Sequence, residues 1–523
     1  MIIQGTNITS DVEERADVVV VGTGAGGATL AVYLAERGWD VVMVERGGFF
    51  RAEDFSQREE EALSAFNGRR GLDTTADNAF FLNYAEAVGG TTVHYWGDSF
   101  RTPTDRLELW RNRHGLEWAD PSELNPHFDA IETELGIHIA EESLFNDNNR
   151  LVRLGCEKLG WHGDAAPTAR VDCIACGWTQ FGCAYNRKQS MLITTVPRVS
   201  RVGGRIYSDA RVERIVLENG RAAGVEAVLV DRASKAPRAR LRVRAEFVVL
   251  AGGALGTADL LLRNLDDDTV GRRFYMNPHF WVFGDFDREI DNVTGIPCAY
   301  AVHEFRRVRL RDGSLAPDAA AGREGEYAGG GYIMLCSHQS PGITAASLSD
   351  TGAGHLERMR KYRQLGSLMS VIDEAHPGRV FLDGQVRKTE FRLRGIDRLK
   401  AIDYIRNAAR IFLAAGAREV WVPDVFGTVV RNEADLAGVT ERCIEPNAQF
   451  AAGSHLLGTA PMGTDPLDSF AGPTGEAHRV PGLYVADGAA IPGSVSVDPS
   501  LTIMAVARWI AAGLHERTGR AGA

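Results

Sequence analysis

The sequence lacks long apolar runs. Within its 523 residues, no segment approaches the ~18 uninterrupted apolar residues that a membrane-spanning helix requires. The short apolar run from Val18 to Val21 lies behind charged residues and lacks the layout of a signal peptide. We therefore expect no transmembrane segment and, as the default, a cytoplasmic location.

Basic residues are not in excess either. The chain has 58 lysines and arginines against 69 aspartates and glutamates, which gives a formal net charge of -11. A protein that binds nucleic acid needs clustered positive charge to contact the phosphates. We therefore expect no nucleic-acid partner and predict a small-molecule substrate.

Cysteine is too scarce for a disulfide-based fold, because seven cysteines are an odd and small number for this length. Cys173, Cys176, Thr179 and Cys183 follow the spacing of a bacterial ferredoxin run with one ligand replaced. These cysteines also allow a zinc site with His162, a redox dithiol, or a structural loop with or without one local disulfide. We assign no metal ligand and favour the structural loop.

A glycine-rich turn between a buried strand and a helix is the strongest motif. Residues Asp17 to Val21 predict a parallel strand, and Gly22-x-Gly24-x-x-Gly27 follows at once. The first glycine makes a tight turn, the second lets the backbone approach a pyrophosphate, and the third lets the helix pack closely. The helix N-terminus favours phosphate, and Glu45 at the end of the next strand can accept ribose hydroxyls. The pattern predicts a dinucleotide site.

The rest of the chain predicts a mixed α/β protein. A small meander with a return strand is expected before residue 280, and strands, loops and one amphipathic helix between residues 280 and 440. A glycine- and alanine-rich stretch from Asp312 to Gly331 is expected on the surface. The main elements are strands at 39–44, 205–207, 212–217, 224–230, 247–250 and 483–486, a short helix near Met191, and helices at 396–414 and 501–514.

Several ordered blocks resemble the glucose-methanol-choline (GMC) oxidoreductase family. Besides the glycine turn, they are residues 88–97 (VGGTTVHYWG), 251–257 (AGGALGT), 455–463 (HLLGTAPMG) and 485–489 (VADGA). The resemblance extends from residue 17 to about 514, is weakest between 280 and 440, and is nearest to the pyranose- and sugar-oxidising branch. It implies a Rossmann-like FAD-binding domain and an α+β substrate domain built on an antiparallel sheet.

The resemblance also implies domain boundaries and cofactor contacts. The FAD-binding domain would comprise residues 1–120, 191–279 and 441–523, with a helical, cysteine-bearing insertion at 121–190 and the substrate-binding domain at 280–440. Val212 would contact adenine through its backbone, and Asp487 would lie near the pyrophosphate and ribityl chain. The expected FAD contacts are Gly22, Gly24, Gly27, Glu45, Arg46, Gly90, Thr91, His94, Val212, Gly252, Asp487, Pro499, Ser500 and Leu501.

His94 raises the question of a covalent flavin. It lies where sugar-oxidising relatives attach FAD through a histidine ring nitrogen. Many relatives bind FAD without that bond, and Tyr95 separates His94 from Trp96, unlike the adjacent His-Trp pair of that subgroup. Both modes of attachment therefore stay open.

The expected catalytic residues are His455 and Asp498. Alcohol oxidation by a flavin needs a base for the hydroxyl proton, and a neutral imidazole suits that task. His455 matches the family's catalytic histidine, whereas Asp498 lies where the family usually has His or Asn. An ionised aspartate only accepts hydrogen bonds, and near His455 it is expected to raise the histidine pKa. It could also hold a cationic or polyhydroxylated substrate, or merely cap the helix that follows.

The sequence thus predicts FAD-dependent oxidation of an alcohol, namely a sugar, glycoside or polyol, to a carbonyl. The hydroxyl proton would pass to His455 and hydride to flavin N5, with Asp498 positioning substrate or base. The electron acceptor stays open between oxygen and a protein or quinone. Two alternatives remain, a flavin disulfide oxidoreductase that uses Cys173 and Cys176, and a non-redox flavin lyase.

Overall fold

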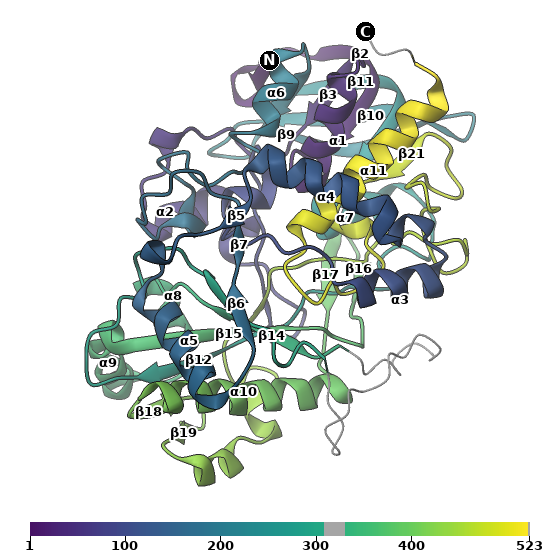
Figure 1. Cartoon of the computed structure of the whole chain (residues 1–523). Coiled ribbons are helices and arrows are strands. Elements are labelled where there is room, and N and C mark those ends of the chain that lie inside the picture. The colour runs from purple at the N-terminus through teal and green to yellow at the C-terminus, as the bar shows by residue number, and fades with distance from the viewer. Residues whose placement is uncertain (308–329, 521–523) are drawn as a thin grey trace.

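The computed structural model describes residues 1–307 and 330–520. Figure 1 shows two regions, each with its own sheet: one carries the chain termini, and the other lies at the opposite end of the molecule beside α10 (Ile396–Ala415). The predicted surface stretch from Asp312 to Gly331 lies almost wholly outside the described residues.

The first sheet contains the predicted strand–turn–helix unit at its centre. Strand β2 (Val12–Val21) pairs in parallel with β3 on one side and β11 on the other, and its valines 18 to 20 are fully buried. The meander predicted from the sequence is formed by β9, β10 and β11, in which β10 pairs antiparallel with both neighbours. The other strands of this sheet are β1 (Ile2–Gln4), β3 (Val41–Val44), β8 (Arg205–Ser208), β9 (Ala210–Glu218), β10 (Arg221–Val230), β11 (Pro237–Leu250) and β21 (Leu483–Val485).

Helices cover this sheet in a layered stack. Helix α1 (Ala25–Ala35) packs against α11 (Ser500–Thr518), and α11 packs in turn against α4 (Pro121–Leu135). A side chain at Gly26 would place its Cβ 1.8 Å from the carbonyl oxygen of Ala486, which follows β21. Helix α1 therefore lies directly against the backbone that follows β21. The helix expected near Met191 is instead a turn, followed by α6 (Thr195–Arg201).

The second sheet is mainly antiparallel. Its order is β19, β18, β12, β15, β14, β13 and β6, and α10 packs on it with α5 (Asp147–Leu159) against α10. Its strands are β6 (Gly163–Ala165), β12 (His279–Asp285), β13 (Tyr300–Val302), β14 (Tyr332–Cys336), β15 (Leu365–Ile372), β18 (Glu419–Trp421) and β19 (Val429–Val430). The predicted antiparallel substrate sheet is confirmed.

Helices from residues 121–190 contact both regions, since α4 packs on α11 and α5 packs on α10. The domain boundaries drawn from the sequence stay a prediction. The remaining elements are α2 (Glu59–Phe66), α3 (Thr104–His114), α7 (Gly253–Asn264), α8 (Pro341–Ser347), α9 (Gly352–Arg360), β4 (Phe81–Leu82), β5 (His138–Ile139), β7 (Pro167–Thr168), β16 (Arg379–Asp383), β17 (Val386–Glu390) and β20 (Ala451–Gly453).

Strand β20 belongs to the second sheet. This strand pairs antiparallel with β12 and parallel with β4, so the segment that leads to His455 is fixed to the second sheet. Asp498, by contrast, directly precedes Pro499 and Ser500, where α11 of the first region begins. The two expected catalytic residues therefore approach each other from different regions.

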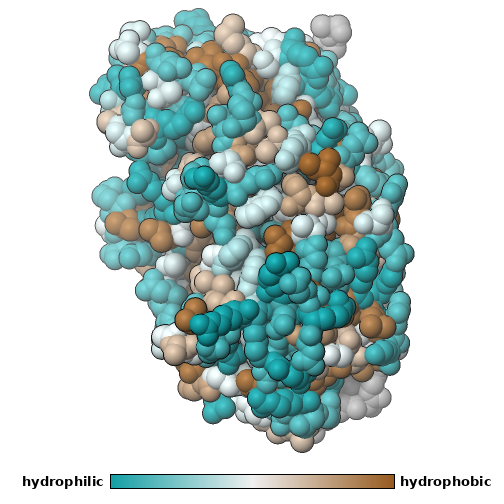
Figure 2. Space-filling model, turned by 90° about the vertical axis from the view of Figure 1, so that its left-hand side faces the viewer, coloured by the Kyte–Doolittle hydropathy of each residue, from teal (hydrophilic) through white to brown (hydrophobic). Residues whose placement is uncertain are grey.

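The molecular surface is mostly polar where Figure 2 shows it. Teal, hydrophilic residues dominate this face, and hydrophobic residues lie in small separate groups. In the part of the chain that the structure describes, no helix combines the length and the apolar character needed to cross a membrane.

The close packing of α1 can be tested with Gly26→Ala. The new methyl group would collide with backbone at Ala486, and such overpacking typically costs about 1–3 kcal/mol or more. We expect a clearly lower thermal unfolding midpoint. Gly438→Ala is the control, because a Cβ there meets nothing within 4 Å. Equal midpoints for the two variants would contradict the packing described here.

Candidate active site

A cavity of about 910 Å³ extends from the glycine turn at Gly22 to His455 and Asp498. This volume is at the upper end of the usual range for ligand pockets, which is roughly 300–1,000 Å³. One wall contains the end of β2 and the beginning of α1, and the far wall contains His279 of β12. The cavity is therefore long enough to connect a dinucleotide site with a catalytic site.

Most of the predicted site residues line this cavity. Gly27 and Leu501 do not: a Cβ at Gly27 would lie 2.3 Å from the carbonyl oxygen of Gly22, and Leu501 is fully buried in the core. The predicted residues in the wall are Gly22, Gly24, Glu45, Arg46, Gly90, Thr91, His94, Val212, Gly252, His455, Asp487, Asp498, Pro499 and Ser500.

The phosphate end of the cavity is formed by backbone. Gly24 is the N-cap residue of α1, and no side chain caps this helix, so its first N–H groups can bind an anion. A Cβ at Gly90 would lie 2.5 Å from Cα of Gly24, so the two glycine segments approach closely. This cradle of bare backbone fits the pyrophosphate of FAD.

The carboxyl group of Glu45 is held in place by hydrogen bonds from other protein groups. Its Oε2 accepts hydrogen bonds from N and Oγ1 of Thr23, at 3.0 and 2.8 Å, and its Oε1 accepts from N of Gly47 at 2.8 Å. Burial raises the pKa of Glu45 even so. The carboxyl group is held rigidly in the wall where the sequence predicts the adenosine ribose.

Asp487 ties β21 to α7. Its carboxylate accepts from N of Ala489 and N of Gly253, both at 2.8 Å, and from Oγ1 of Thr257 at 2.6 Å. Burial raises its pKa to about 6. Asp487 lies in the cavity wall, and its role toward the pyrophosphate and ribityl chain stays a prediction.

His94 is a buried, neutral histidine in the same wall. Burial, reinforced by the charge of Lys188, lowers its pKa to about 3. Lys188 Nζ donates to the carbonyl oxygens of Val93 and Tyr95, at 2.7 and 2.8 Å, and so holds the backbone on both sides of His94. This position fits a covalent bond to flavin and a non-covalent contact equally.

The catalytic candidates lie in direct contact. Nε2 of His455 lies 2.8 Å from Oδ1 of Asp498, and both residues are buried. Burial lowers the pKa of His455 to about 4, although the charge of Asp98 opposes this shift, and burial raises the pKa of Asp498 to about 6. Near pH 7 the pair is therefore a neutral imidazole beside a carboxylate.

The structure bears on two readings of Asp498. Desolvation lowers the pKa of His455 overall, and the expected effect of Asp498 in raising that pKa stays a prediction. The other expectation was a helix cap. Pro499 is the N-cap residue of α11, no side chain caps this helix, and the carboxylate of Asp498 bonds to His455 instead.

His279 belongs to the site and was missed by the sequence analysis. Its Nδ1 donates to the carbonyl oxygen of Ser370 at 2.7 Å, and Nε2 has no partner among the described residues. Its ring centroid lies 5.0 Å from that of His455, and burial together with His455 lowers its pKa to about 3. A single histidine at the beginning of an apolar strand gives no sequence signal. The contact arises because β12 pairs with β20.

Asp98 is the second missed residue. It is 5% exposed and lines the cavity, and burial together with the charge of Asp498 raises its pKa well above the ordinary value. A signal was available, because Asp98 directly follows the glycine-rich block that ends at Gly97.

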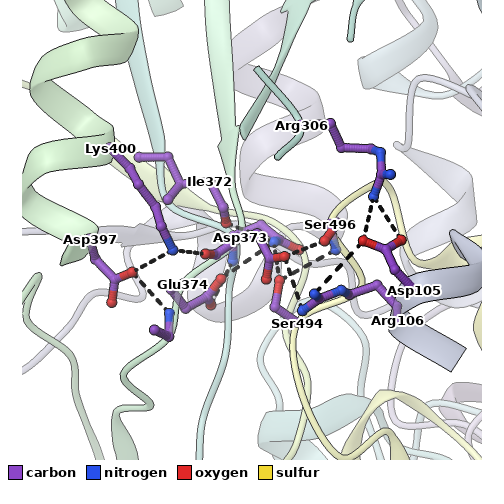
Figure 3. Close-up of polar contacts among 12 residues, drawn as sticks. Asp105, Arg106, Arg306, Ile372, Asp373, Glu374, Asp397, Lys400, Ser494 and Ser496 are labelled. Atoms are coloured by element: carbon purple, nitrogen blue, oxygen red, sulfur yellow. Dashed lines mark hydrogen bonds and ion pairs between the residues drawn. The ribbon is translucent and has the colours of Figure 1, made fainter. Parts of the chain in front are cut away.

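The loop that carries Asp498 is held by a buried polar network, drawn in Figure 3. Asp373, at the end of β15, receives a hydrogen bond from Oγ of Ser496 and forms an ion pair with Arg106 of α3 at 3.2 Å. Ser496 has a φ of 66°, which is unusual for a residue other than glycine. The network therefore holds this loop in a conformation that it would rarely adopt alone.

Neighbouring contacts extend the network toward His279. Nδ2 of Asn277 donates to Oγ of Ser494 at 2.7 Å and to the carbonyl oxygen of Ile372 at 2.8 Å. Glu374 accepts from the backbone N–H groups of Met276 and Asn277, and burial raises its pKa to about 8. The strand that carries His279 and the loop that carries Asp498 are thus tied together.

The cysteine loop lies outside the main cavity. Cys173, Cys176 and Cys183 line a separate pocket of about 20 Å³, and all cysteines are free. Burial opposes ionisation of Cys183, but backbone N–H groups of Lys188 and Arg187 lower its pKa overall. Within residues 1–307 and 330–520, no group of three or more His, Cys, Asp or Glu side chains is placed to hold a metal ion.

The fold and the site together define a class of protein. A glycine cradle for a dinucleotide and a buried histidine–aspartate pair share one cavity, as in a cofactor-dependent oxidoreductase. Sequence models described as GMC oxidoreductase match residues 6–278 and 378–507. The chain belongs to the GMC oxidoreductase family, whose members depend on FAD.

Individual relatives agree with this assignment. A GMC-type oxidoreductase of Mycobacterium tuberculosis is 31% identical over 510 residues, covering 95% of this chain and 75% of the relative. A long-chain-alcohol oxidase of Arabidopsis thaliana is 26% identical over 520 residues, covering 95% and 67%. The solved structure of pyridoxine 4-oxidase from Mesorbium loti has the same fold, with a TM-score of 0.72, 17% identity, and coverage of 96% of this chain and 99% of the other.

Because the ion pair of Arg106 and Asp373 supports the loop that carries Asp498, we expect Arg106→Met to destabilise the fold strongly. Removing one partner of a buried pair leaves the charge of Asp373 uncompensated, which typically costs about 3–5 kcal/mol. We expect a marked loss of stability to thermal and urea unfolding. Arg363→Met is the control, since the pair of Arg363 with Glu289 is exposed. Equal stability of the two variants would show that Arg106 does not hold Asp373.

The position of the cysteine loop predicts that its thiols are not needed for flavin chemistry. In a Cys173→Ser, Cys176→Ser double variant, we expect the rate of flavin reduction by substrate to stay within about twofold of the unmodified enzyme. The reason is that neither thiol lines the main cavity. Abolished flavin reduction in a folded, flavin-loaded variant would instead favour the disulfide oxidoreductase.

Proposed function

We propose that this chain oxidises an alcohol to a carbonyl compound with FAD, using His455 as the base. The observation that carries the proposal is the buried pair of His455 and Asp498, 2.8 Å apart, in the same cavity as the dinucleotide cradle. When bound, FAD supplies a hydride acceptor at its N5 atom.

The protein's part in the reaction is to accept the hydroxyl proton. Nε2 of His455 lies 2.8 Å from Oδ1 of Asp498, and both residues line the cavity. The neutral ring carries its proton on Nε2, toward the carboxylate, so Nδ1, which has no hydrogen-bond partner among the described residues, is the atom that can accept the hydroxyl proton. A neutral imidazole can take up the substrate proton, and the carboxylate then stabilises the resulting cation across 2.8 Å. Because the pair is buried, this charge interaction is stronger than it would be in water.

The walls near the pair favour an alcohol that carries an apolar or aromatic group. A row of aromatic rings begins at His455. The distance between ring centroids is 5.0 Å from His455 to His279, 6.3 Å from His279 to Trp281, and 5.3 Å from Trp281 to Phe450. All four side chains line the cavity. The name of the long-chain-alcohol oxidase from Arabidopsis thaliana also supports an apolar alcohol.

A sugar, glycoside or polyol is the second candidate substrate. Gln180 and Gln339 line the same cavity, and their amides can bond to hydroxyl groups.

The two substrate classes can be separated by mixing the flavin-loaded enzyme anaerobically with aryl alcohols, alkyl alcohols and sugars. Loss of the yellow flavin colour identifies the compounds that reduce the flavin. Reoxidation of the reduced enzyme in air then tests oxygen against a protein or quinone acceptor. If no substrate bleaches the flavin, the non-redox lyase gains support.

The base can be tested with His455→Gln. We expect flavin to remain bound and the rate of its anaerobic reduction to fall by about 10²–10⁴, the usual contribution of a general base. His138→Gln is the control, because His138 is exposed and lies outside the cavity. A full reduction rate in flavin-loaded His455→Gln would rule out His455 as the base.

A further inference from the structure

We propose that Cys183 is a reactive thiol that hydroperoxides oxidise to a sulfenic acid, which then closes a disulfide with Cys176 of the same pocket. This pocket lies outside the main cavity, and the flavin chemistry described above does not use its thiols. The inference therefore stands apart from the proposed function.

The sulfur of Cys183 lies in a turn whose backbone N–H groups converge on it. Sγ accepts hydrogen bonds from N of Arg187 at 3.2 Å and from N of Lys188 at 3.4 Å. Asn186, just before them, has a φ of 53° and donates from its backbone N to the carbonyl oxygen of Cys183 at 3.1 Å. Successive N–H groups in such a turn form a concave site for an anion. Here the sulfur occupies that site, so the turn favours the thiolate form of Cys183.

Cys183 is a better nucleophile than Cys176 of the Cys-x-x-Cys pair. Burial opposes ionisation of Cys183, but its backbone donors outweigh burial and lower the pKa of this thiol. Burial raises the pKa of Cys176, and the negative charge of Cys183 adds to that rise. The thiolate, not the thiol, is the form that attacks a peroxide. Cys183 is therefore the thiol that reacts first, and Cys176 the one that reacts second.

The three thiols border one small pocket with room for a hydroperoxide group. Cys173, Cys176 and Cys183 line a space of about 20 Å³, and each of these side chains is partly exposed. A volume of roughly 10–15 Å³ is enough for one water molecule, and hydrogen peroxide is only slightly larger than water. Ile174 and Tyr185 of the same loop are 51% and 48% exposed. The pocket thus lies at the surface, where a small oxidant can reach it.

The other cysteines lack these features. Cys156, Cys298, Cys336 and Cys443 are buried, and burial raises the pKa of each thiol. None of the four lines the small pocket. An oxidant in solvent therefore meets Cys183 before it meets these thiols.

The oxidation balances with a hydroperoxide as the oxidant. The Cys183 thiolate attacks one peroxide oxygen, the O–O bond breaks and an S–O bond forms. The leaving hydroxide, or the alkoxide of an organic hydroperoxide, takes a proton from solvent and departs as water or an alcohol. The sulfur of Cys176 then attacks the sulfenic acid, an S–S bond replaces the S–O bond, and the hydroxyl group leaves as water with the thiol proton. Two thiols are thus oxidised and one peroxide is reduced.

The experiment treats the flavin-loaded enzyme with hydrogen peroxide at neutral pH. Residues 171–187 form one tryptic peptide that carries all three thiols of the pocket. We expect this peptide to become lighter by two hydrogen atoms. After chymotrypsin has cut at the aromatic residues between Cys176 and Cys183, the two fragments should stay joined until a reductant is added. A disulfide of Cys173 with Cys176, with Cys183 left as a thiol, would overturn the proposal.

Serine variants separate the two steps. In a Cys173→Ser, Cys176→Ser double variant, the sulfenic acid of Cys183 has no thiol to close on, so dimedone, a reagent for sulfenic acids, should label Cys183. Cys173→Ser alone is the matched control and should still form the disulfide. In Cys183→Ser, we expect the remaining two thiols to oxidise at least about tenfold more slowly. An unchanged rate would contradict the role of Cys183.

A labelling experiment on the unmodified holoenzyme does not depend on how the variants fold. With limiting iodoacetamide, Cys183 should be alkylated at least about tenfold faster than Cys176, because the thiolate is the reacting form. The four buried cysteines are internal controls and should stay unlabelled until the protein is denatured. Labelling of Cys176 as fast as Cys183, or faster, would overturn the proposal, whether or not any alcohol reduces the flavin.

Discussion

The 2.8 Å contact between His455 and Asp498 depends on the fixed positions of the two sheets. His455 follows β20, which pairs with the second sheet, and Asp498 precedes α11, which packs against the first region. The polar network around Asp373 ties the loop of Asp498 to β15 of the second sheet. A small shift between the regions would separate the pair, so the chemistry requires the whole junction to be rigid.

Burial controls the charges in the cavity more than neighbouring charges do. It lowers the pKa of His455 and raises the pKa of Glu45, Asp487 and Asp498. The carboxyl groups of Glu45 and Asp487 accept hydrogen bonds from backbone and threonine donors, whereas Asp498 contacts His455 through Oδ1 and its Oδ2 has no hydrogen-bond partner among the described residues. The carboxyl groups of Glu45 and Asp487 are therefore held in place by several hydrogen bonds, whereas that of Asp498 is held less firmly.

Most of the correct sequence-based predictions came from patterns of residues that lie close together in the chain. The glycine turn, the strand before it and the position of Glu45 depend on neighbours in the chain, and the structure contains all three. His455 was found through the family resemblance of its block. His279 and the pKa of His455 escaped prediction because both depend on strand pairing and burial between segments far apart in the sequence.

Lys188 is a buried amine whose pKa is lowered well below its ordinary value by burial, and among the described residues its Nζ contacts three backbone carbonyls and no carboxylate. Its Nζ donates to Val93, to Tyr95 and, at 2.6 Å, to Thr179 of the cysteine loop. Lys188 Nζ thus links the cysteine loop to the cavity wall beside His94. A different cysteine loop grafted onto this scaffold could vary its thiols, but it would have to keep Lys188, because this side chain also holds the backbone of the cavity wall on both sides of His94.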